Sequence, residues 1–450
     1  MGQGGIKVAA MFAAVSLTAG CLGETGGVPF VSKLSGGADA QVQPAGANGT
    51  KVAALAQTPT ANDETLNEES VVITGLLARR SVLPAGSAYD RVSTAVLAAN
   101  ARAAETELRA ARLRAQAASK NWLPTIGPRI SLNSLGDIIT QIVVDQVIFD
   151  NGRKKGERAF AKADVEVAAV TLAEDTNDRV ATGLGLYLSA AEAREVGALH
   201  RTTLREMEHF EYIMSERVRG GVSDMSDLHV IRQKLSEIRA SIAASEETSA
   251  TAIAELNAMA AQPLDDVRGL ETLAISAQAA QPLTVTRADS EKERSIAQAQ
   301  IDRASQLPGI NAQATVGENS GAGLTVGGAN FGLGTAARLK SIEAAKEAAG
   351  RQVAQANEDA NRTLRRLEGD VTATGRQAGE ARGLTAQAKA NLDLFQEQYE
   401  AGRRQVMDVV GVYETFAERQ NAEVALKYEA LRLQVELARV QGVLADGDQI

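Results

Sequence analysis

The chain has 450 residues, enough for two or three domains of roughly 150 residues each. Hydrophobic residues make up 44% of it but aromatic residues only 3%, which argues against a large enzyme core built from Phe, Tyr and Trp. Abundant alanine instead favours long, closely packed helices. The formal net charge of −9 disfavours nucleic acid as a partner. The single cysteine, Cys21, excludes an intrachain disulfide and a cysteine-rich metal site.

The first residues have the pattern of an export signal. Residues 1–20 combine one lysine with an apolar stretch that is too short to span a bilayer, so we expect a signal peptide. The sequence Leu17-Thr-Ala-Gly-Cys21 resembles the lipobox of bacterial lipoproteins, in which the cysteine is lipidated, although Thr18 departs from the usual Leu, Val or Ile. The alternative is an ordinary signal peptide with an incidental cysteine. Residues 21–84 are expected to be a flexible, lipid-anchored tether.

The rest of the chain shows the same order of signals twice, which predicts an internal twofold repeat. We expect a first copy over residues 85–261 and a second over 290–445, joined by a linker at 262–289. Each copy has a helical stretch ending at a proline, an alternating segment, a glycine, a long helical run, a glycine break and another helix. Four landmark pairs recur at similar offsets: Pro124 and Pro308 (184 residues), Gly152 and Gly334 (182), Gly221 and Gly402 (181), and Asp227 and Asp408 (181).

Two long runs, 153–219 and 335–401, are expected to be continuous helices. Each contains 67 residues and would be about 100 Å long. Helices of this length are not stable alone in water and need lateral partners. Because apolar residues recur at helical spacing, we expect antiparallel coiled-coil packing.

The segments between the prolines and the glycines are each long enough for a β-hairpin. We expect hairpins at about 125–150 and 309–332, because a membrane-crossing strand needs only about 9–11 residues. No run of 18 apolar residues follows the first 22 positions, so a membrane crossing by the body of the chain would have to use strands. In the second hairpin apolar and polar side chains alternate, as in a barrel wall between lipid and water: Ile310, Ala312, Ala314 and Val316 against Asn311, Gln313 and Thr315.

Four strands cannot close a barrel wide enough for a pore, and open sheet edges cannot lie in lipid. Either the strands lie outside a membrane, or several chains share one barrel. Three chains would supply twelve strands, a suitable number for an aqueous channel.

Two motifs are similar to those of a known family. Residues 144–154, Val-Asp-Gln-Val-Ile-Phe-Asp-Asn-Gly-Arg-Lys, resemble the strand-to-helix junction of the TolC family of outer-membrane channel proteins. Residues 399–409, Tyr-Glu-Ala-Gly-Arg-Arg-Gln-Val-Met-Asp-Val, resemble the helix-to-helix turn at that family's periplasmic entrance. Together with the repeat, the prolines before the hairpins and the lipobox, the resemblance covers residues 85–445.

The resemblance implies a mainly helical fold with a small β part. The chain would be a homotrimer whose twelve strands form an outer-membrane β-barrel, continued by a long α-helical barrel across the periplasm. It would act as a passive duct, with no enzymatic activity and no cofactor. Its implied partners are two further copies of itself, outer-membrane lipid, a periplasmic adaptor (membrane fusion) protein and an inner-membrane pump of ABC, RND or MFS type. Drug efflux, type I protein secretion and polysaccharide export all use such ducts, and the sequence does not indicate the cargo.

The resemblance also implies a gate at the periplasmic entrance. In the family a tyrosine and an arginine beside the second turn tie the closed entrance to an aspartate beside the first, and the matching residues here are Tyr399, Arg404 and Asp227. Asp408 matches one acidic ring of the constriction, whereas Gly411 stands at the second ring and carries no charge. The alternative is that these are ordinary solvated charges at helix ends.

Other signals point less clearly to a function. Gly332-Leu-Gly-Thr-Ala-Ala337 imitates a dinucleotide-binding fingerprint, but no second strand follows within about thirty residues. The only histidines are His200, His209 and His229, and none belongs to an H-E-x-x-H zinc motif. The main alternative to a channel is a lipid-anchored periplasmic coiled-coil scaffold whose hairpins lie outside the membrane. A soluble enzyme is a more distant one.

Overall fold

The computed structural model describes residues 70–99, 103–132, 138–275, 281–317, 320–327 and 332–449. All of them belong to one unit, residues 59–450. The chain is mainly helical with one four-stranded sheet, so this part of the prediction is confirmed. The predicted signal peptide, residues 1–20, and the predicted lipidation site, Cys21, lie outside the described residues.

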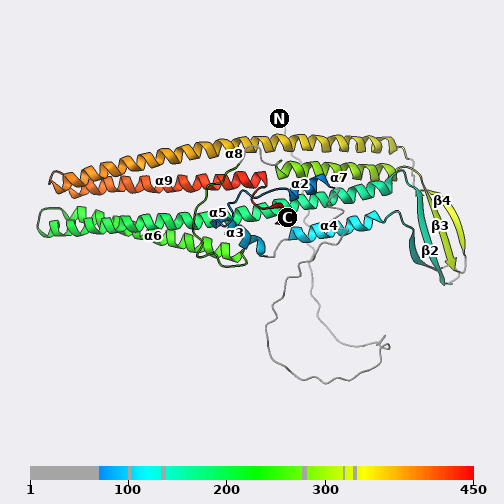
Figure 1. Cartoon of the computed structure of the whole chain (residues 1–450), viewed down its shortest axis with the longest axis horizontal. Coiled ribbons are helices and arrows are strands. Elements are labelled where there is room, and N and C mark those ends of the chain that lie inside the picture. The colour runs from blue at the N-terminus through cyan, green and yellow to red at the C-terminus, as the bar shows by residue number, and fades with distance from the viewer. Residues whose placement is uncertain are drawn as a thin grey trace, which may run out of the picture. The chain divides into compact units, whose positions relative to one another are not determined.

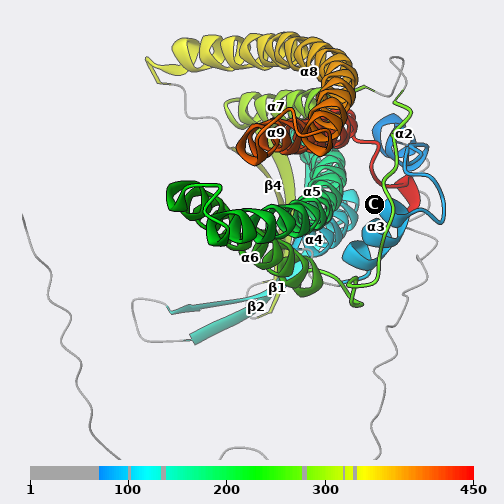
Figure 2. The same ribbon diagram turned by 90° about the vertical axis from the view of Figure 1, so that its left-hand side faces the viewer.

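The long helices run side by side, and the sheet lies at one end of them (Figure 1). At the other end lie two turns, and each of them joins a long helix to the helix that follows it in the chain. Viewed from that end, the long helices form a curved layer with the two short N-terminal helices on one side (Figure 2). The elements in chain order are α2 (Val71–Leu77), α3 (Ala88–Ala98), α4 (Ala103–Ser119), β1 (Thr125–Leu132), β2 (Ile138–Phe149), α5 (Arg153–Arg219), α6 (Met225–Ala258), α7 (Leu283–Ser305), β3 (Gly309–Gly317), β4 (Gly321–Gly327), α8 (Thr335–Glu400), α9 (Val406–Gln441) and the 3₁₀ turn η1 (Gly447–Gln449).

Helix α5 is the central helix of this layer, and 23 of its 67 residues are buried. Most of them are Ala, Val and Leu; the small alanines let neighbouring helices approach closely, and Val and Leu fill the space between them. A Cβ atom at Gly156 would lie 3.0 Å from Cγ1 of Ile301, so glycine allows the close contact between α5 and α7. None of the described helices is both long enough and apolar enough to cross a bilayer.

Three apolar clusters hold the helices together. The largest lies in the middle of α5, where Tyr187 meets Tyr89 of α3 edge to face with ring centroids 6.1 Å apart. A second cluster lies nearer the sheet and joins α5 to α2 and α4. The third lies near the far turns and joins α5, α6, α8 and α9. Burial along the whole length of the layer therefore replaces one compact core.

A row of ionic contacts fixes α9 against α5. Lys427 Nζ lies 2.8 Å from Glu195 Oε2, and the hydroxyl of Tyr428 donates to the same oxygen at 2.9 Å. Burial, followed by this hydrogen bond to Glu195, raises the pKa of Tyr428. Arg432 pairs with Glu192, one helical turn away. Because the contacts join the first half of the chain to the second, they set the position of α9 along α5.

Two predicted boundaries differ from the structure. The tether was expected to extend over 21–84, but α2 lies within it, with Ile73 and Leu76 buried against α5. Arg79 is also buried there and donates to the carbonyl oxygens of Gln441 and Gly442, which lie at the end of α9. The linker was expected over 262–289, but α7 already begins at Leu283, directly after Pro282.

Candidate functional site

The sheet is a simple antiparallel meander in the order β1-β2-β3-β4. Its register pairs Ile126 with Val144 and Ile142 with Val316, so side chains of one kind line up across neighbouring strands. A register shift between Val147 and Phe149 breaks the pattern only at the helical end of β2. The alternation predicted for β3 is therefore part of a pattern that extends over four strands.

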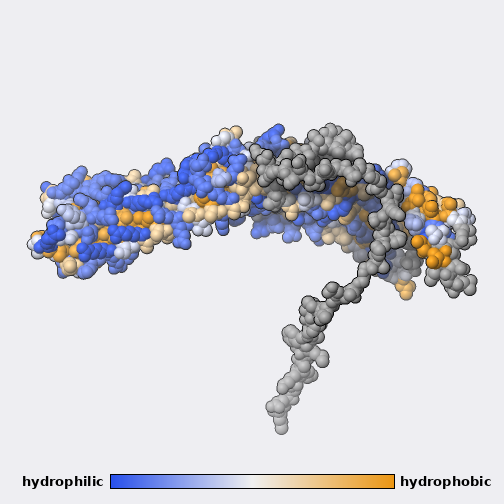
Figure 3. Space-filling model, turned by 90° about the horizontal axis from the view of Figure 1, so that it is seen from below, coloured by the Kyte–Doolittle hydropathy of each residue, from blue (hydrophilic) through white to orange (hydrophobic). Residues whose placement is uncertain are grey.

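One side of the sheet, which we call the apolar face, is mostly hydrophobic, with Thr140 and Gln146 as polar members, and many of its large side chains are exposed. Ile126 is 71% exposed and Leu324 is 72% exposed, although neither contributes to any apolar cluster within the chain. The surface at the sheet end of the molecule is correspondingly the most hydrophobic part of the visible face in Figure 3. Its main members are Ile126, Ile130, Ile138, Ile142, Val316, Leu324 and Val326.

The opposite side, which we call the polar face, carries the alternate residues of the same strands; β2 departs from the pattern, because Val143, which is buried, and Val147 lie on this side too. Arg129 stands across from Gln141, and the amide of Gln313 donates to Asp145 Oδ1 at 2.8 Å. On β4 this face has Thr325 between glycines. A sheet with one apolar and one polar face fits a wall that separates lipid from water.

The two outer strands have free edges. Among the described strands, none pairs with the outer side of β1 or of β4. Exposed hydrophobic strands with unpaired amides favour association with other strands. Because the sheet has an even number of antiparallel strands, β1 and β4 run in opposite directions, so β4 of one copy can pair in antiparallel fashion with β1 of another.

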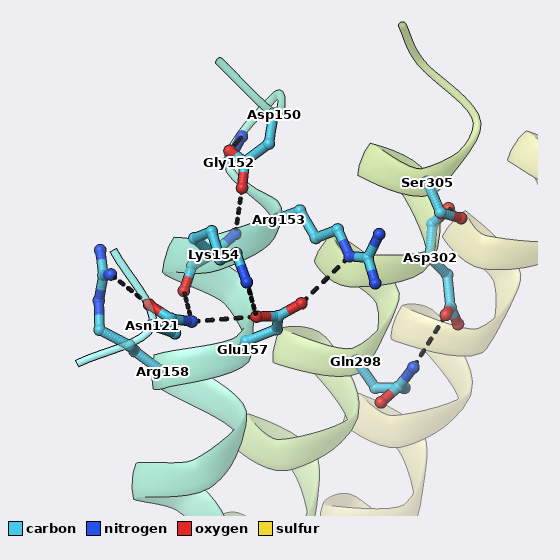
Figure 4. A network of polar contacts seen from close by, with 10 residues as sticks. All are labelled: Asn121, Asp150, Gly152, Arg153, Lys154, Glu157, Arg158, Gln298, Asp302 and Ser305. Atoms are coloured by element: carbon cyan, nitrogen blue, oxygen red, sulfur yellow. Dashed lines mark hydrogen bonds and ion pairs between the residues drawn. The ribbon is translucent and has the colours of Figure 1, made fainter. Parts of the chain in front are cut away.

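The junction between β2 and α5 is built from local polar contacts (Figure 4). The Asp150 carboxylate accepts hydrogen bonds from the backbone N–H of Gly152 and of Lys154, which caps the start of α5. Asn151 and Gly152 have positive φ angles of 55° and 86°, conformations that Asn and Gly adopt at low cost. Asn121 Nδ2 donates to Glu157 at 3.0 Å and so joins α5 to the segment after α4. These contacts explain the Asp-Asn-Gly sequence that follows Phe149.

The far turns repeat one design. Gly221 after α5 and Gly402 after α8 both have positive φ, at 71° and 73°. Asp224 caps α6, and Gln405 with Asp408 forms a capping box at the start of α9. The two turns lie at the same end of the helical layer (Figure 1), next to the third apolar cluster.

The four proposed gate residues, Asp227, Tyr399, Arg404 and Asp408, all lie at this end. Tyr399 is partly buried against the third apolar cluster, and Asp227 lies in the first turn of α6. The guanidinium carbon of Arg404 lies 4.4 Å from the ring centroid of Phe395, and its Nε donates to Gln398 Oε1 at 3.0 Å. Among the described contacts, none joins Arg404 to Asp227 within one chain. The structure therefore brings the residues to one end without pairing them inside the monomer.

The histidines do not form a site. His200 and His209 lie on α5 and His229 on α6, and no group of three His, Cys, Asp or Glu side chains among the described residues could hold a metal ion. His200 is half-buried, and this burial lowers the pKa of its ring below the ordinary value.

Comparisons with known sequences and with solved structures give different results. No family model and no curated protein matches this sequence. Solved structures do match. The Campylobacter jejuni CmeC outer membrane channel superposes with a TM-score of 0.67 at 12% identity, over 79% of this chain and 86% of that one. VceC, an outer membrane protein of Vibrio cholerae, gives 0.64 at 16% identity, over 86% and 99%.

The open state of the Neisseria gonorrhoeae MtrE outer membrane channel gives a TM-score of 0.67 at 14% identity, over 82% of this chain and 95% of that chain. At these identities the likeness concerns the fold, and it extends over nearly the whole of each solved chain. The chain has the fold of the TolC family of outer-membrane channels.

Proposed function

We propose that this chain is the outer-membrane channel of a tripartite efflux or type I secretion system and acts as a passive trimeric duct. The observation that carries this proposal is the sheet, which has one apolar face, one polar face and two free edges. Exposing the unpaired amides of a strand edge to lipid costs too much free energy, so in a membrane the two edges of the sheet must pair with further strands. The fold shared with outer-membrane channels supports the same function.

Closure by identical copies follows from the strand directions. In a head-to-tail ring, β4 of each copy pairs with β1 of the next, and all edges disappear. Three copies give twelve strands, which leave room for water inside the barrel. The apolar face then contacts lipid and the polar face lines the lumen.

The helices supply the second half of the duct. Helix α5, with 67 residues, would extend about 100 Å from the barrel into the periplasm. Its far turn is then the surface offered to a periplasmic adaptor protein and an inner-membrane pump. Lipidation of Cys21 would add an anchor in the same membrane, and incorporation of radiolabelled palmitate by wild type but not by Cys21→Ser tests it.

The decisive test places one arginine on each face of the same strand. Leu324→Arg puts a charge on the apolar face, where it costs about 2–4 kcal/mol at the bilayer midplane, whereas the adjacent Thr325→Arg puts it on the polar face. We expect heat-sensitive trimers and ion currents in planar bilayers from wild type and Thr325→Arg, and loss of both in Leu324→Arg. A monomeric wild-type protein without currents would contradict the proposal and favour a periplasmic scaffold.

For the far end we propose that Tyr399, Arg404 and Asp227 hold the entrance closed in the assembled trimer. Since the described residues give Arg404 a ring and a neutral amide as partners and no carboxylate, its charge remains available to a carboxylate of a neighbouring copy. Arg404→Ala should raise single-channel conductance, and the adjacent exposed Arg403→Ala is the matched control. Equal conductance in wild type and Arg404→Ala would remove this gate. With Gly411 uncharged, Asp408 is left to provide the cation preference, so Asp408→Asn should reduce it.

A further inference from the structure

The helix ends next to the sheet carry a concentration of positive charge. They contain eight basic and three acidic residues, 8 − 3 = +5, although the whole chain has a formal net charge of −9. The count covers the last turn of α4 and the segment after it, the start of α5, the end of α7 and the start of α8: residues 116–124, 150–158, 302–308 and 332–340.

Most of these basic residues have no counter-ion among the described residues. Arg153 and Lys154 share the carboxylate of Glu157, at 3.1 and 3.4 Å (Figure 4). The other six basic residues have no ion pair with any described carboxylate, and only Arg158 is held, by the neutral side chain of Asn121. We call these six the basic collar: Lys120, Lys155, Arg158, Arg303, Arg338 and Lys340.

The collar residues at the starts of α5 and α8 are unfavourable for these helices, whereas Lys120 and Arg303 lie at the ends of α4 and α7, where a cation is favourable. The start of a helix carries a partial positive charge and prefers acidic side chains. Helix α5 instead begins Arg-Lys-Lys, and neither α5 nor α8 has an acidic residue in its first turn; the Asp150 carboxylate before α5 is one negative charge against these three cations. Where a local rule of helix design is broken, a functional compensation is expected. Negative charge supplied from outside the chain would provide it.

The position of the collar indicates the source of that charge. The exposed rings of Trp122 and Phe149 lie between the apolar face and the collar in the chain, as interfacial aromatic residues do. From Arg153 to Arg158 the helix rises about 8 Å, similar to the headgroup layer on one side of a bilayer. The collar therefore lies where lipid phosphates would be if the apolar face lies in the hydrocarbon.

The orientation of α5 agrees with this. Arg153 and Lys154 line a cavity of about 250 Å³ together with Asn311 of the polar face. Each residue turns by about 100° around the helix, so Lys155 lies about 200° from Arg153, on the other side of α5. The paired cations thus lie toward the proposed lumen and Lys155 points away from it.

We propose that the basic collar binds the phosphate groups of anionic phospholipids in the leaflet nearest the helices and thereby fixes the depth of the sheet in the membrane. This inference depends on the proposed channel function. It makes a lipid surface, rather than a free anion, the ligand, because the six cations come from four helix ends and do not enclose a pocket.

The test uses the full-length protein in nanodiscs of equimolar phosphatidylcholine and phosphatidylglycerol. Native mass spectrometry after mild detergent extraction gives the ratio of the two lipids retained. We expect wild type to retain phosphatidylglycerol in about threefold excess, and the excess to fall in 0.5 M salt. Replacing all six collar residues by Gln should bring the ratio close to one. The matched control replaces six exposed arginines of α3, α5 and α6 that lie outside the collar, Arg91, Arg201, Arg205, Arg219, Arg232 and Arg239, and should behave as wild type.

Equal retention of the two lipids by wild type would overturn the collar, whatever the variants do. Displacement of phosphatidylglycerol by inorganic phosphate alone would overturn the lipid surface as ligand. If the six-residue variant does not assemble, the double variant Lys155→Gln/Lys340→Gln should show an intermediate ratio, and a wild-type ratio would contradict the proposal. Planar-bilayer currents are measured in parallel: wild type with currents but no lipid preference refutes the collar alone, whereas wild type without currents refutes the channel and the collar with it.

Discussion

Helices α5 and α8 have almost the same length, 67 and 66 residues, and each follows a β-hairpin, yet their surroundings differ greatly. Helix α5 has 23 buried residues and is packed against α3, α4, α6, α7 and α9. Helix α8 has five buried residues, and its extensive contacts within the described chain are with α7 and α9. The same position in the order of elements thus does not require the same burial.

The exposed flank of α8 consists of charges and small residues. Its arginines mostly pair within the helix, as Arg376 does with Glu380 at 3.2 Å. Gly369, Gly375, Gly379 and Gly383 have no atom within 4 Å of the place where a Cβ would be. Each glycine costs about 1 kcal/mol relative to alanine in a helix. Such a helix needs a further partner, and in the proposed trimer a neighbouring copy would cover this flank.

The largest difference between the two helices is expected for leucine truncation. Leu188 of α5 is fully buried, so Leu188→Ala should lower the free energy of unfolding by about 3–5 kcal/mol. Leu384 of α8 is 48% exposed in the chain, and Leu384→Ala should cost less than about 1 kcal/mol in the monomer. Urea unfolding of detergent-dissociated monomers, followed by circular dichroism, measures both. Similar losses would show that α8 is as well packed as α5.

Glycine-to-alanine substitutions should have opposite signs in the two helices. A Cβ at Gly183 of α5 would lie 3.0 Å from Cγ2 of Val96, so Gly183→Ala should destabilise the monomer by about 1–3 kcal/mol. Gly379→Ala in α8 meets open space and should stabilise the monomer by up to about 1 kcal/mol. Thermal unfolding of the monomers gives the two signs. A destabilised Gly379→Ala monomer would mean that α8 is closely covered within its own chain.

Much of this fold is predictable from the sequence because its signals are local. Long helical spacing, prolines before the strands and positive-φ glycines such as Gly152 and Gly402 depend only on neighbouring residues, and they placed the helices and hairpins. The packing of Ile73 and Leu76 on α5 and the contact of Arg79 with Gln441, 362 positions away, depend on residues distant in the sequence. Such contacts leave no periodic pattern in the local sequence, so residues 70–84 were predicted to be part of the tether.

The functional residues divide in the same way. The turn motifs place Asp227 and Arg404 at one end of the molecule, but motifs do not say which partner an exposed arginine chooses. The structure gives Phe395 and Gln398. The Arg-Lys-Lys start of α5 was visible in the sequence from the beginning. Its meaning required the sheet register, which shows where the apolar face ends.

Polar contacts between helices should show the same contrast at a smaller scale. The buried hydroxyl of Tyr428 donates to Glu195 of α5, so Tyr428→Phe should cost about 1–2 kcal/mol. Between α8 and α9, Arg382 lies 3.5 Å from Glu423 with its side chain largely exposed, so Arg382→Gln should cost less than about 0.5 kcal/mol. Urea midpoints at constant slope measure both costs. Equal costs would show that the Arg382–Glu423 ion pair is as well shielded from water as the Tyr428–Glu195 hydrogen bond.

The smallest expected effect is a pH dependence that only the α5–α6 half can contribute, because the second half has no histidine. Burial lowers the pKa of His200 in the folded state below its ordinary value of 6.5. The unfolded chain therefore binds the proton more readily, and stability falls as the pH drops below about 6.5. Between pH 7.5 and 5.5 the free energy of unfolding should fall less in His200→Gln than in wild type. The difference is about a few tenths of a kcal/mol after allowance for solvent screening. His209→Gln, at an exposed position of the same helix, is the control. If both variants keep the wild-type slope, the acid sensitivity arises from other groups.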